Sequence, residues 1–341
     1  MKKQLQENLI IKNSHFEQYS EKEKLEKLAF FKCALDHIYE KYLIVSDLDG
    51  TLLNNQAQIT NFTKEIIQLL NQYDHKFCLA TGRPWRSSHV FYEQLKLDTL
   101  IANLNGAIMF QPYDLHMTPI KFVFSSHILK KLCDQEEIVS AIENIIVEDG
   151  QNLRTYRPLN EENIAALSQW FHMDLKKDKP LLGFDQLFEQ KRNIPSILIQ
   201  LSVNVDIDYV ITLIKSKIKT LTCQMWSLND RSHILEVNTT FANKGNSLNF
   251  FSSYYGIPWD QTIAFGDGYN DVSLLSSAHY GYAMKNSKTT TKFVAKGVTK
   301  FDNDNNGVAW KIIDFFTNIL KEKHPNHYER IKKACASNSL K

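Results

Sequence analysis

The sequence predicts an α/β protein with a Rossmann-like, doubly wound parallel sheet core and an inserted α+β cap domain. Short apolar runs alternate with segments of helical periodicity, which is the pattern of parallel strands joined by crossover helices. This rhythm stops near residue 116 and resumes near residue 236. The intervening segment falls in the range of roughly 50 to 250 residues that can hold a core of its own. We therefore expect an inserted α+β domain at 116–235.

The composition is that of an ordinary globular protein. Of 341 residues 43% are hydrophobic, and glycine (12) and proline (8) are scarce, which excludes disordered and low-complexity classes. The net charge of +2 disfavours nucleic acid and anionic membranes as partners. The five scattered cysteines favour neither a disulfide framework nor a zinc ribbon. With no signal-like start and no membrane-spanning run, we expect a cytoplasmic protein.

Residues 1–41 are predicted to form an N-terminal helical extension. Two interpretations remain open, namely a helix that docks a protein partner or a membrane surface and a helix that packs on the protein's own body. The second is favoured because Lys and Glu alternate and no basic face emerges. The helix is indicated by apolar residues at three- and four-residue spacing, which are Leu25, Leu28, Phe31, Leu35, Ile38 and Tyr42.

The core is expected at 42–115 and 236–320. Its strands are predicted from short β-branched or apolar runs, and its helices from a period near 3.6 residues. The predicted strands are 42–46, 76–80, 100–103, 261–265 and 280–284, and the predicted helices are 60–72, 85–97, 272–277 and 308–320. In the insert the clearest elements are a strand at 196–203 and a helix at 209–218.

Residues 321–341 are predicted to be a basic C-terminal tail. This segment has six Lys and Arg residues against two Glu residues, which is typical of a solvated terminus. His324 and His327 have a spacing that suits a metal, but an exposed helix end is the favoured interpretation.

Polar residues follow several predicted strands at the point where each strand ends. Asp47 and Asp49 follow the first strand, Thr81 follows the second, and Asp267 and Asp271 follow a later one. In an open parallel sheet these ends converge on one crevice. Carboxylates gathered there repel each other unless a cation intervenes, and a donor set made only of oxygens favours Mg²⁺ over zinc.

This set of residues suits phosphoryl transfer, in which positioning and charge neutralisation do most of the work. Asp47 would attack phosphorus. Asp49, two residues on, would point to the same side if the strand geometry persisted, and would act as acid and base. Thr81 and Lys244 would hold phosphoryl oxygens.

A dinucleotide site is the alternative for the loop that begins Gly266-Asp267-Gly268. This segment starts like Gly-x-Gly-x-x-Gly, but Asp271 stands where the third glycine is needed. Hydride chemistry is therefore disfavoured.

Four segments together resemble the haloacid dehalogenase superfamily and, within it, the Cof-type branch (cap class IIB) of magnesium-dependent phosphatases. The resemblance covers roughly residues 42–320, and Asn103-Leu104-Asn105-Gly106-Ala107 is similar to the stretch where that branch's chain leaves for its cap. The motifs are Asp47-Leu48-Asp49-Gly50-Thr51-Leu52-Leu53, Ala80-Thr81-Gly82-Arg83-Pro84, Lys244-Gly245 and Gly266-Asp267-Gly268-Tyr269-Asn270-Asp271.

The resemblance implies a role for each motif residue. Asp47 would be the nucleophile and a Mg²⁺ ligand, and Asp49 the acid/base whose backbone carbonyl also reaches the metal. Asp267 and Asp271 would be further metal ligands. The phosphoryl group would be bound by Thr81, Gly82, Lys244 and Asn270.

Two departures from the family pattern concern the pocket. The loop before Lys244 lacks the usual Pro-x-Gly-Val-Ser, which weakens the placement of this lysine. Lys285 replaces a glycine of the family's Ala-Met-Gly-Asn, so an additional ammonium group is either at the pocket rim or, as we favour, in solvent.

The substrate is expected to be a small phosphorylated metabolite, either a sugar phosphate or a nucleotide-like cofactor. Arg83 would either touch it or brace the helix below. The cap would act as a lid. A phosphomutase or phosphotransferase and a catalytically idle phosphate-binding regulatory module remain as alternatives. Candidate residues of the cap for reading the leaving group are Arg154, Tyr156, Arg157, Lys191 and Arg192.

Overall fold

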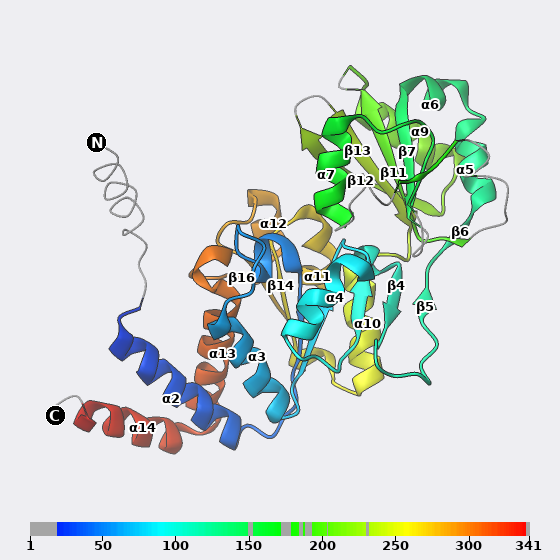
Figure 1. Cartoon of the computed structure of the whole chain (residues 1–341). Helices are drawn as coiled ribbons and strands as arrows, with labels where there is room; N and C mark the ends of the chain where they lie inside the picture. The colour runs from blue at the N-terminus through cyan, green and yellow to red at the C-terminus, as the bar shows by residue number, and fades with distance from the viewer. Residues whose placement is uncertain are drawn as a thin grey trace, which may run out of the picture.

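The computed structural model describes residues 19–148, 153–171, 179–183, 187, 193–202, 204–229 and 232–338. Within these residues the chain forms two large sheets, each with its own helices, and a small two-stranded sheet; the second large sheet is inserted between strands of the first (Figure 1). No helix in the described ranges has both the length and the apolar character needed to cross a membrane.

The first sheet forms the core. Its order is β16-β15-β14-β1-β2-β3-β4-β5, in which β1 to β3 and β14 to β16 pair in parallel and β4 and β5 add an antiparallel edge. The predicted fold class is confirmed, since parallel strands need crossover connections of this kind. The strands are β1 (Leu43–Ser46), β2 (Lys76–Ala80), β3 (Ile101–Asn103), β4 (Ile108–Phe110), β5 (Ile120–Lys121), β14 (Thr262–Gly266), β15 (Tyr280–Ala283) and β16 (Gly297–Val298).

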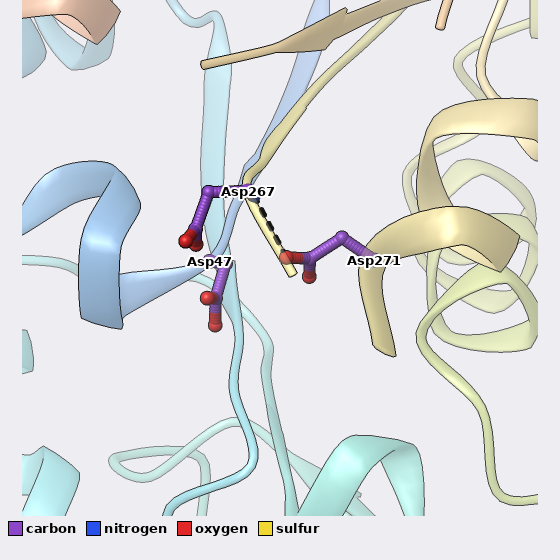
Figure 2. Close-up of side chains that lie close together, drawn as sticks. All are labelled: Asp47, Asp267 and Asp271. Carbon is purple, nitrogen blue, oxygen red and sulfur yellow. Dashed lines mark hydrogen bonds between the residues drawn. The ribbon is translucent and has the colours of Figure 1, made fainter. Parts of the chain in front are cut away.

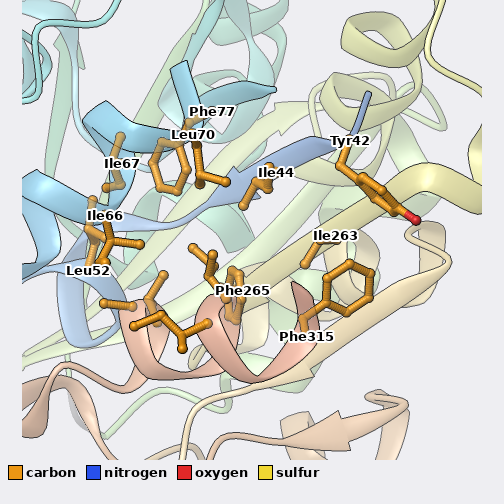
Figure 3. Close-up of a cluster of buried hydrophobic side chains, with 14 of the residues drawn as sticks. Tyr42, Ile44, Leu52, Ile66, Ile67, Leu70, Phe77, Ile263, Phe265 and Phe315 are labelled. Atoms are coloured by element: carbon orange, nitrogen blue, oxygen red, sulfur yellow. The ribbon is translucent and has the colours of Figure 1, made fainter. Parts of the chain in front are cut away.

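Apolar side chains cover both faces of this sheet because successive residues of a strand point to opposite sides. Ile44 lies in one buried cluster with residues of α3 and α13, whereas Leu43 and Val45 lie in another with residues of α10 and α11. Figure 3 shows the first cluster. The core helices are α3 (Asn61–Gln72), α4 (Trp85–Gln94), α10 (Lys244–Tyr255), α11 (Val272–Ser277), α12 (Thr289–Val294) and α13 (Gly307–Lys323).

The second sheet belongs to the inserted segment and carries its helices beside it (Figure 1). Its order is β12-β13-β11-β7-β8-β9. The strands are β7 (Ile142–Glu148), β8 (Leu153–Thr155), β9 (Leu181–Leu182), β11 (Ser196–Ser202), β12 (Leu221–Asn229) and β13 (Ser232–Thr239). The helices are α5 (Ser126–Cys133), α6 (Glu136–Ala141), α7 (Glu161–Phe171) and α9 (Ile207–Lys217).

Two segments connect the cap with the core. On the outgoing side, β6 (Phe124–Ser125) pairs with β10 (Asn193–Ile194) in an antiparallel ladder. On the return side, β13 leads to Asn243, whose side chain accepts a hydrogen bond from the Asn246 N–H and caps α10. The last strand of the cap therefore runs almost directly into the helix that begins with Lys244.

Helix α2 (Glu21–His37) precedes the core and packs against α13. Ser20 and Glu23 form a capping box at its start. Phe31 is fully buried, whereas Leu25 is 68% exposed. The prediction that this helix packs on the protein's own body is thus confirmed for the described residues. The helix ends before Tyr42, which lies in extended chain next to β1.

The described part of the C-terminal segment is a helix, and its charged residues are exposed. Residues Pro325–Asn338 form helix α14, which contacts both α2 and α13. The ring of Tyr328 stacks on Phe30 with centroids 4.8 Å apart, and the ring of His327 lies 3.9 Å from that of His37. The number of basic residues in this segment did not indicate that it packs on α2. The rings of His327 and Tyr328 lie between the charged residues and pack on α2, while the charged groups stay in water.

Candidate active site

Asp47 is positioned by the register of the central strands. Ser46 at the end of β1 pairs with Phe265 of β14 and with Leu79 of β2. Asp47, the next residue, donates its backbone N–H to the Phe265 carbonyl at 3.1 Å. Its carboxylate is therefore held at the carboxyl edge of the sheet, where α/β proteins bind their ligands.

Asp267 and Asp271 come from the loop after β14. Asp271 Oδ2 accepts the backbone N–H groups of Asp267 and Gly268, each at 2.9 Å. Figure 2 shows that the loop brings both carboxylates toward Asp47. One oxygen from each of the three residues lies within 4.8 Å of the others. This loop thus delivers two acids to the end of β1.

Lys244 supplies the positive charge of this cluster. Its Nζ lies 2.7 Å from Asp47 Oδ1 and 2.6 Å from Asp271 Oδ1, and its side chain is fully buried. Burial by itself would lower the pKa of Lys244, but Asp271 and Asp47 outweigh this effect and raise it. The atypical loop before Lys244 therefore still places the ammonium group between the acids.

The cluster carries excess negative charge. Burial raises the pKa of Asp47 well above its usual value; Lys244 opposes this rise, and Asp271 and Asp267 add to it. Burial and Asp271 raise the pKa of Asp267 to about 6. A single lysine thus leaves three crowded carboxylates under-neutralised.

This donor set fits a hard divalent cation. The three carboxylates offer only oxygen, and their mutual spacing suits one ion that keeps further sites for water and a phosphate. A Cβ at Gly50, whose φ is +69°, would lie 2.4 Å from Asp267 Oδ2, so the turn after β1 can approach this carboxylate only as glycine.

Asp49 lies outside the group formed by Asp47, Asp267 and Asp271. The expectation of persisting strand geometry is wrong, because β1 ends at Ser46 and a tight turn over Leu48–Leu52 follows. Asp49 instead pairs with Arg83, whose guanidinium carbon also lies 5.2 Å from the Phe91 ring centroid in α4. Arg83 was expected either to touch the substrate or to brace the helix below. Its contact with Phe91 of α4 is present, and it also forms the ion pair with Asp49.

The other predicted phosphate-binding residues, Thr81, Gly82 and Asn270, contact Arg83 and Asn105. Thr81 is fully buried, and its Oγ1 accepts the Arg83 backbone N–H at 3.1 Å. Gly82 passes close to the Asn105 carboxamide, since a Cβ at position 82 would lie 3.4 Å from its Oδ1. Asn270 donates through Nδ2 to that same Oδ1 at 3.0 Å.

The predicted substrate-reading residues are distributed over the cap. Arg154 is 3% exposed within β8. Tyr156 follows it, and the Arg157 guanidinium lies 5.3 Å from the Tyr156 ring centroid. Lys191 and Arg192 lie outside the described residues. A role of these side chains in substrate binding stays a prediction.

The sequence alone did not reveal several supporting contacts. Thr51 donates to Asp267 Oδ1 at 3.0 Å, and Asn286 Nδ2 donates to the Gly50 carbonyl at 2.7 Å. Thr51 belongs to the first family motif, and Asn286 belongs to the segment that corresponds to the family's Ala-Met-Gly-Asn. The family resemblance was therefore the signal that could have pointed to them. Glu236 binds Asn105, and no local pattern pointed to it. Lys285 is exposed, as favoured.

The family model for haloacid dehalogenase-like hydrolases matches residues 44–312, which is most of the chain and includes every residue of the acid cluster. The chain belongs to this family. The resemblance drawn from the motifs is confirmed, and the protein is an enzyme of the haloacid dehalogenase phosphatase type.

Two relatives of this haloacid dehalogenase-like hydrolase are named phosphatases. The 5-amino-6-(5-phospho-D-ribitylamino)uracil phosphatase YitU of Bacillus subtilis is 30% identical, over 81% of this chain and 98% of the relative. Phosphatase YwpJ of the same organism is 26% identical, over 78% of this chain and 97% of the relative.

Solved structures share the fold. A haloacid dehalogenase-like hydrolase from Bacteroides thetaiotaomicron has a TM-score of 0.64 and 22% identity, over 81% of this chain and 100% of that chain. A haloacid dehalogenase subclass IIB sugar phosphatase has a TM-score of 0.65 and 21% identity, with the same coverage. These likenesses extend over both the core and the inserted cap.

Proposed function

We propose that this phosphatase is a Mg²⁺-dependent phosphomonoester hydrolase that works through an aspartyl-phosphate on Asp47. The observation that carries the proposal is the position of Asp47 at the end of β1, with Lys244 Nζ 2.7 Å from its carboxylate and Asp267 and Asp271 beside it. A buried carboxylate in this setting is poised for attack on a phosphoryl group rather than for a structural ion pair.

The reaction divides between two aspartates. An Asp47 oxygen attacks phosphorus, the ester P–O bond breaks, and Asp49 gives its proton to the departing alkoxide. Asp49 then takes a proton from water, the resulting hydroxide attacks phosphorus, and the bond to Asp47 breaks to release phosphate. Thr81, Lys244 and Asn270 hold the oxygens that are not exchanged.

Mg²⁺ is the cation that the donor set supports. Asp47, Asp267 and Asp271 would hold it, with the Asp49 backbone carbonyl as a further oxygen. When bound, it would neutralise charge on the phosphoryl group and on these acids. Burial and, after it, the neighbouring Asp271 raise the pKa of Asp267 to about 6, and the ion would offset both the lost hydration and the repulsion between these acids.

The substrate class is a small phosphorylated metabolite, namely a sugar phosphate or a nucleotide-like compound. The Bacillus subtilis relative is named for a uracil that carries a phosphorylated ribitylamino chain, which makes this compound a specific candidate. Arg154, Tyr156 and Arg157, with Lys191 and Arg192, are the cap residues proposed to read the leaving group. A cytoplasmic location completes the proposal.

The test is phosphate release by the full chain from a panel of sugar phosphates, nucleotides, pyridoxal phosphate, flavin mononucleotide and the phosphorylated uracil named above. Turnover should require Mg²⁺ and stop with a chelator. Asp47→Asn, which is nearly isosteric, should lower kcat at least about a thousandfold. Full activity of this variant, or no turnover of any ester, would refute the proposal.

A phosphotransferase is the second candidate on the same core. It requires that the Asp47 phosphoryl group pass to an alcohol instead of water. Adding acceptor sugars to the assay separates the two, since transfer yields a new phosphate ester at the expense of free phosphate. An inactive wild type that still binds phosphate would instead favour the regulatory module.

A further inference from the structure

Glu236 is a buried carboxylate on the strand by which the chain leaves the cap. It lies in β13, where it pairs with Leu198 of β11 and Gln224 of β12, and it is 7% exposed. None of the ion pairs found among the described residues includes it. A carboxylate in such a position needs hydrogen-bond donors to offset its lost hydration.

The donors to Glu236 come from both domains. Ser196 Oγ at 3.3 Å and Asn238 Nδ2 at 3.0 Å belong to the cap sheet. Asn105 Nδ2, at 3.0 and 2.9 Å from the two carboxylate oxygens, belongs to the turn after β3 in the core. Glu236 is therefore a polar link between the cap and the core.

Asn105 extends this link to the phosphoryl pocket. Its backbone N–H donates to the Thr81 carbonyl at 3.0 Å, which fixes the residue on the second motif. Its Oδ1 accepts from Asn270 Nδ2 at 3.0 Å. We call the chain of side chains Glu236, Asn105 and Asn270 the amide relay.

The carboxylate sets the direction of the amide relay. An ionised carboxylate only accepts hydrogen bonds, so Asn105 must turn its NH₂ group toward Glu236 and its oxygen toward Asn270. Asn270 must then turn its own NH₂ group toward Asn105. One hydrogen of this group is used, and the other has no acceptor among the described residues.

That remaining hydrogen is the one that an oxygen of a phosphoryl group can accept. If the relay reversed, Asn270 would present its carbonyl oxygen to the anion instead, and the two oxygens would repel each other. We propose that Glu236 is a positioning residue, which orients Asn270 through Asn105 and thereby connects the return strand of the cap to the phosphoryl pocket. This inference rests on the proposed function.

The decisive variant is Glu236→Gln. If the Gln oxygen takes the position of Oε1, it keeps the bonds from Ser196, Asn238 and Asn105, but the Gln NH₂ group then meets the Asn105 NH₂ group at about the former 2.9 Å. Either this unfavourable contact between two NH₂ groups remains, or the carboxamides of Asn105 and Asn270 both turn over, which reverses the direction of the amide relay. The matched control is Glu143→Gln in β7, because Glu143 also accepts from an amide, Gln200 Nε2 at 3.0 Å, but within the cap.

The experiment measures kcat and KM for p-nitrophenyl phosphate, the dissociation constant of inorganic phosphate by calorimetry in Mg²⁺, and Tm. Glu236→Gln should raise KM and weaken phosphate binding about tenfold, while kcat changes much less, since ground state and transition state lose the same contact. Glu143→Gln should match wild type in all of these measurements.

A second substitution should rescue the first. In the double variant Asn105→Asp, Glu236→Gln, the carboxylate introduced at position 105 accepts from the Gln NH₂ group and from Asn270 Nδ2, so the original direction is restored. KM and phosphate affinity should return to within about threefold of wild type. No recovery, or a Glu236→Gln variant as good as Glu143→Gln, would overturn the proposal.

Asn105→Gly provides an independent route if Glu236→Gln does not fold. Asn105 has φ +55°, which glycine adopts freely, and the change cuts the relay without altering Glu236. An unchanged KM and phosphate affinity in this variant would also overturn the proposal. Wild-type turnover tests the proposed function separately: an active wild type with unaffected variants refutes only the role of Glu236.

Discussion

The guanidinium of Arg83 binds both carboxylate oxygens of Asp49, with Nε 2.7 Å from Oδ2 and Nη2 2.6 Å from Oδ1. This is the bidentate arrangement that only arginine provides. Arg83 is 9% exposed, and its buried Nη1 has no hydrogen-bond partner among the described residues. Both carboxylate oxygens of Asp49, the proposed acid and base, thus accept hydrogen bonds from Arg83, which fixes the orientation of this carboxylate.

Arg83→Lys should therefore impair protonation of the leaving group. Lysine keeps the positive charge but cannot donate to both carboxylate oxygens in the bidentate geometry of a guanidinium group. The kcat for an alkyl phosphate such as a sugar phosphate should therefore fall about tenfold or more. p-Nitrophenyl phosphate, whose leaving group departs without a proton, should lose much less. Asp49→Asn should show the same split more strongly. Equal losses on both esters would mean that Arg83 acts on substrate binding instead.

Thr51 is predicted to tune the metal site. Its hydroxyl donates to Asp267 Oδ1 and orients a proposed ligand. Thr51→Val should raise the Mg²⁺ concentration needed for half-maximal activity by about tenfold, with little change at saturation. Thr51→Ser keeps the hydroxyl and should behave as wild type in the same titration. If the two variants gave the same Mg²⁺ dependence, the hydroxyl would have no such role.

His75 is predicted to make stability depend on pH. It is 1% exposed and accepts the Tyr42 backbone N–H through Nδ1, and burial lowers its pKa from 6.5 to about 4. Between pH 6.5 and 4 the unfolded chain binds a proton that the folded chain does not. This contribution to stability is complete above pH 6.5 and is lost as pH falls toward 4, by up to roughly 3 kcal/mol.

The check is urea unfolding of wild type, His75→Asn and His127→Asn at several pH values. His75→Asn should flatten the dependence of the free energy of unfolding between pH 6.5 and 4. His127 is exposed, so its replacement should leave the wild-type slope. An equal slope in all three proteins would mean that His75 does not control this range.

Helix α2 is predicted to be part of the folded core rather than a detachable accessory. Phe31 is fully buried and meets the Phe316 ring of α13 edge to face, with centroids 5.8 Å apart. Phe31→Ala should lower the free energy of unfolding by about 3 to 5 kcal/mol. Leu25→Ala, at a position that is 68% exposed, should have little effect. Similar unfolding curves for both variants would contradict this packing.

The core strands and the acid cluster could be predicted because their signals are local. The predicted strand at 76–80 and helix at 272–277 have the same bounds as β2 and α11. An apolar run followed by Asp47 places the acid at a strand end whatever the rest of the chain does. The turn after β1 was missed because the chain leaves strand geometry directly after Asp47, in the turn over Leu48–Leu52, and Asp49 then pairs with Arg83.

The sequence by itself determined the chemistry that is available: the candidate acids, hydroxyls and lysine of the site, and the order of strands and helices that presents them. Only the tertiary structure decided which of them meet. Asn105 and Glu236 are 131 positions apart, and Asp49 and Arg83 belong to different loops. Such pairs depend on sheet register and on the path of the cap's return strand, and both are set by the burial of the whole core. The residues of these pairs therefore show no periodic pattern in the sequence that would predict the contact.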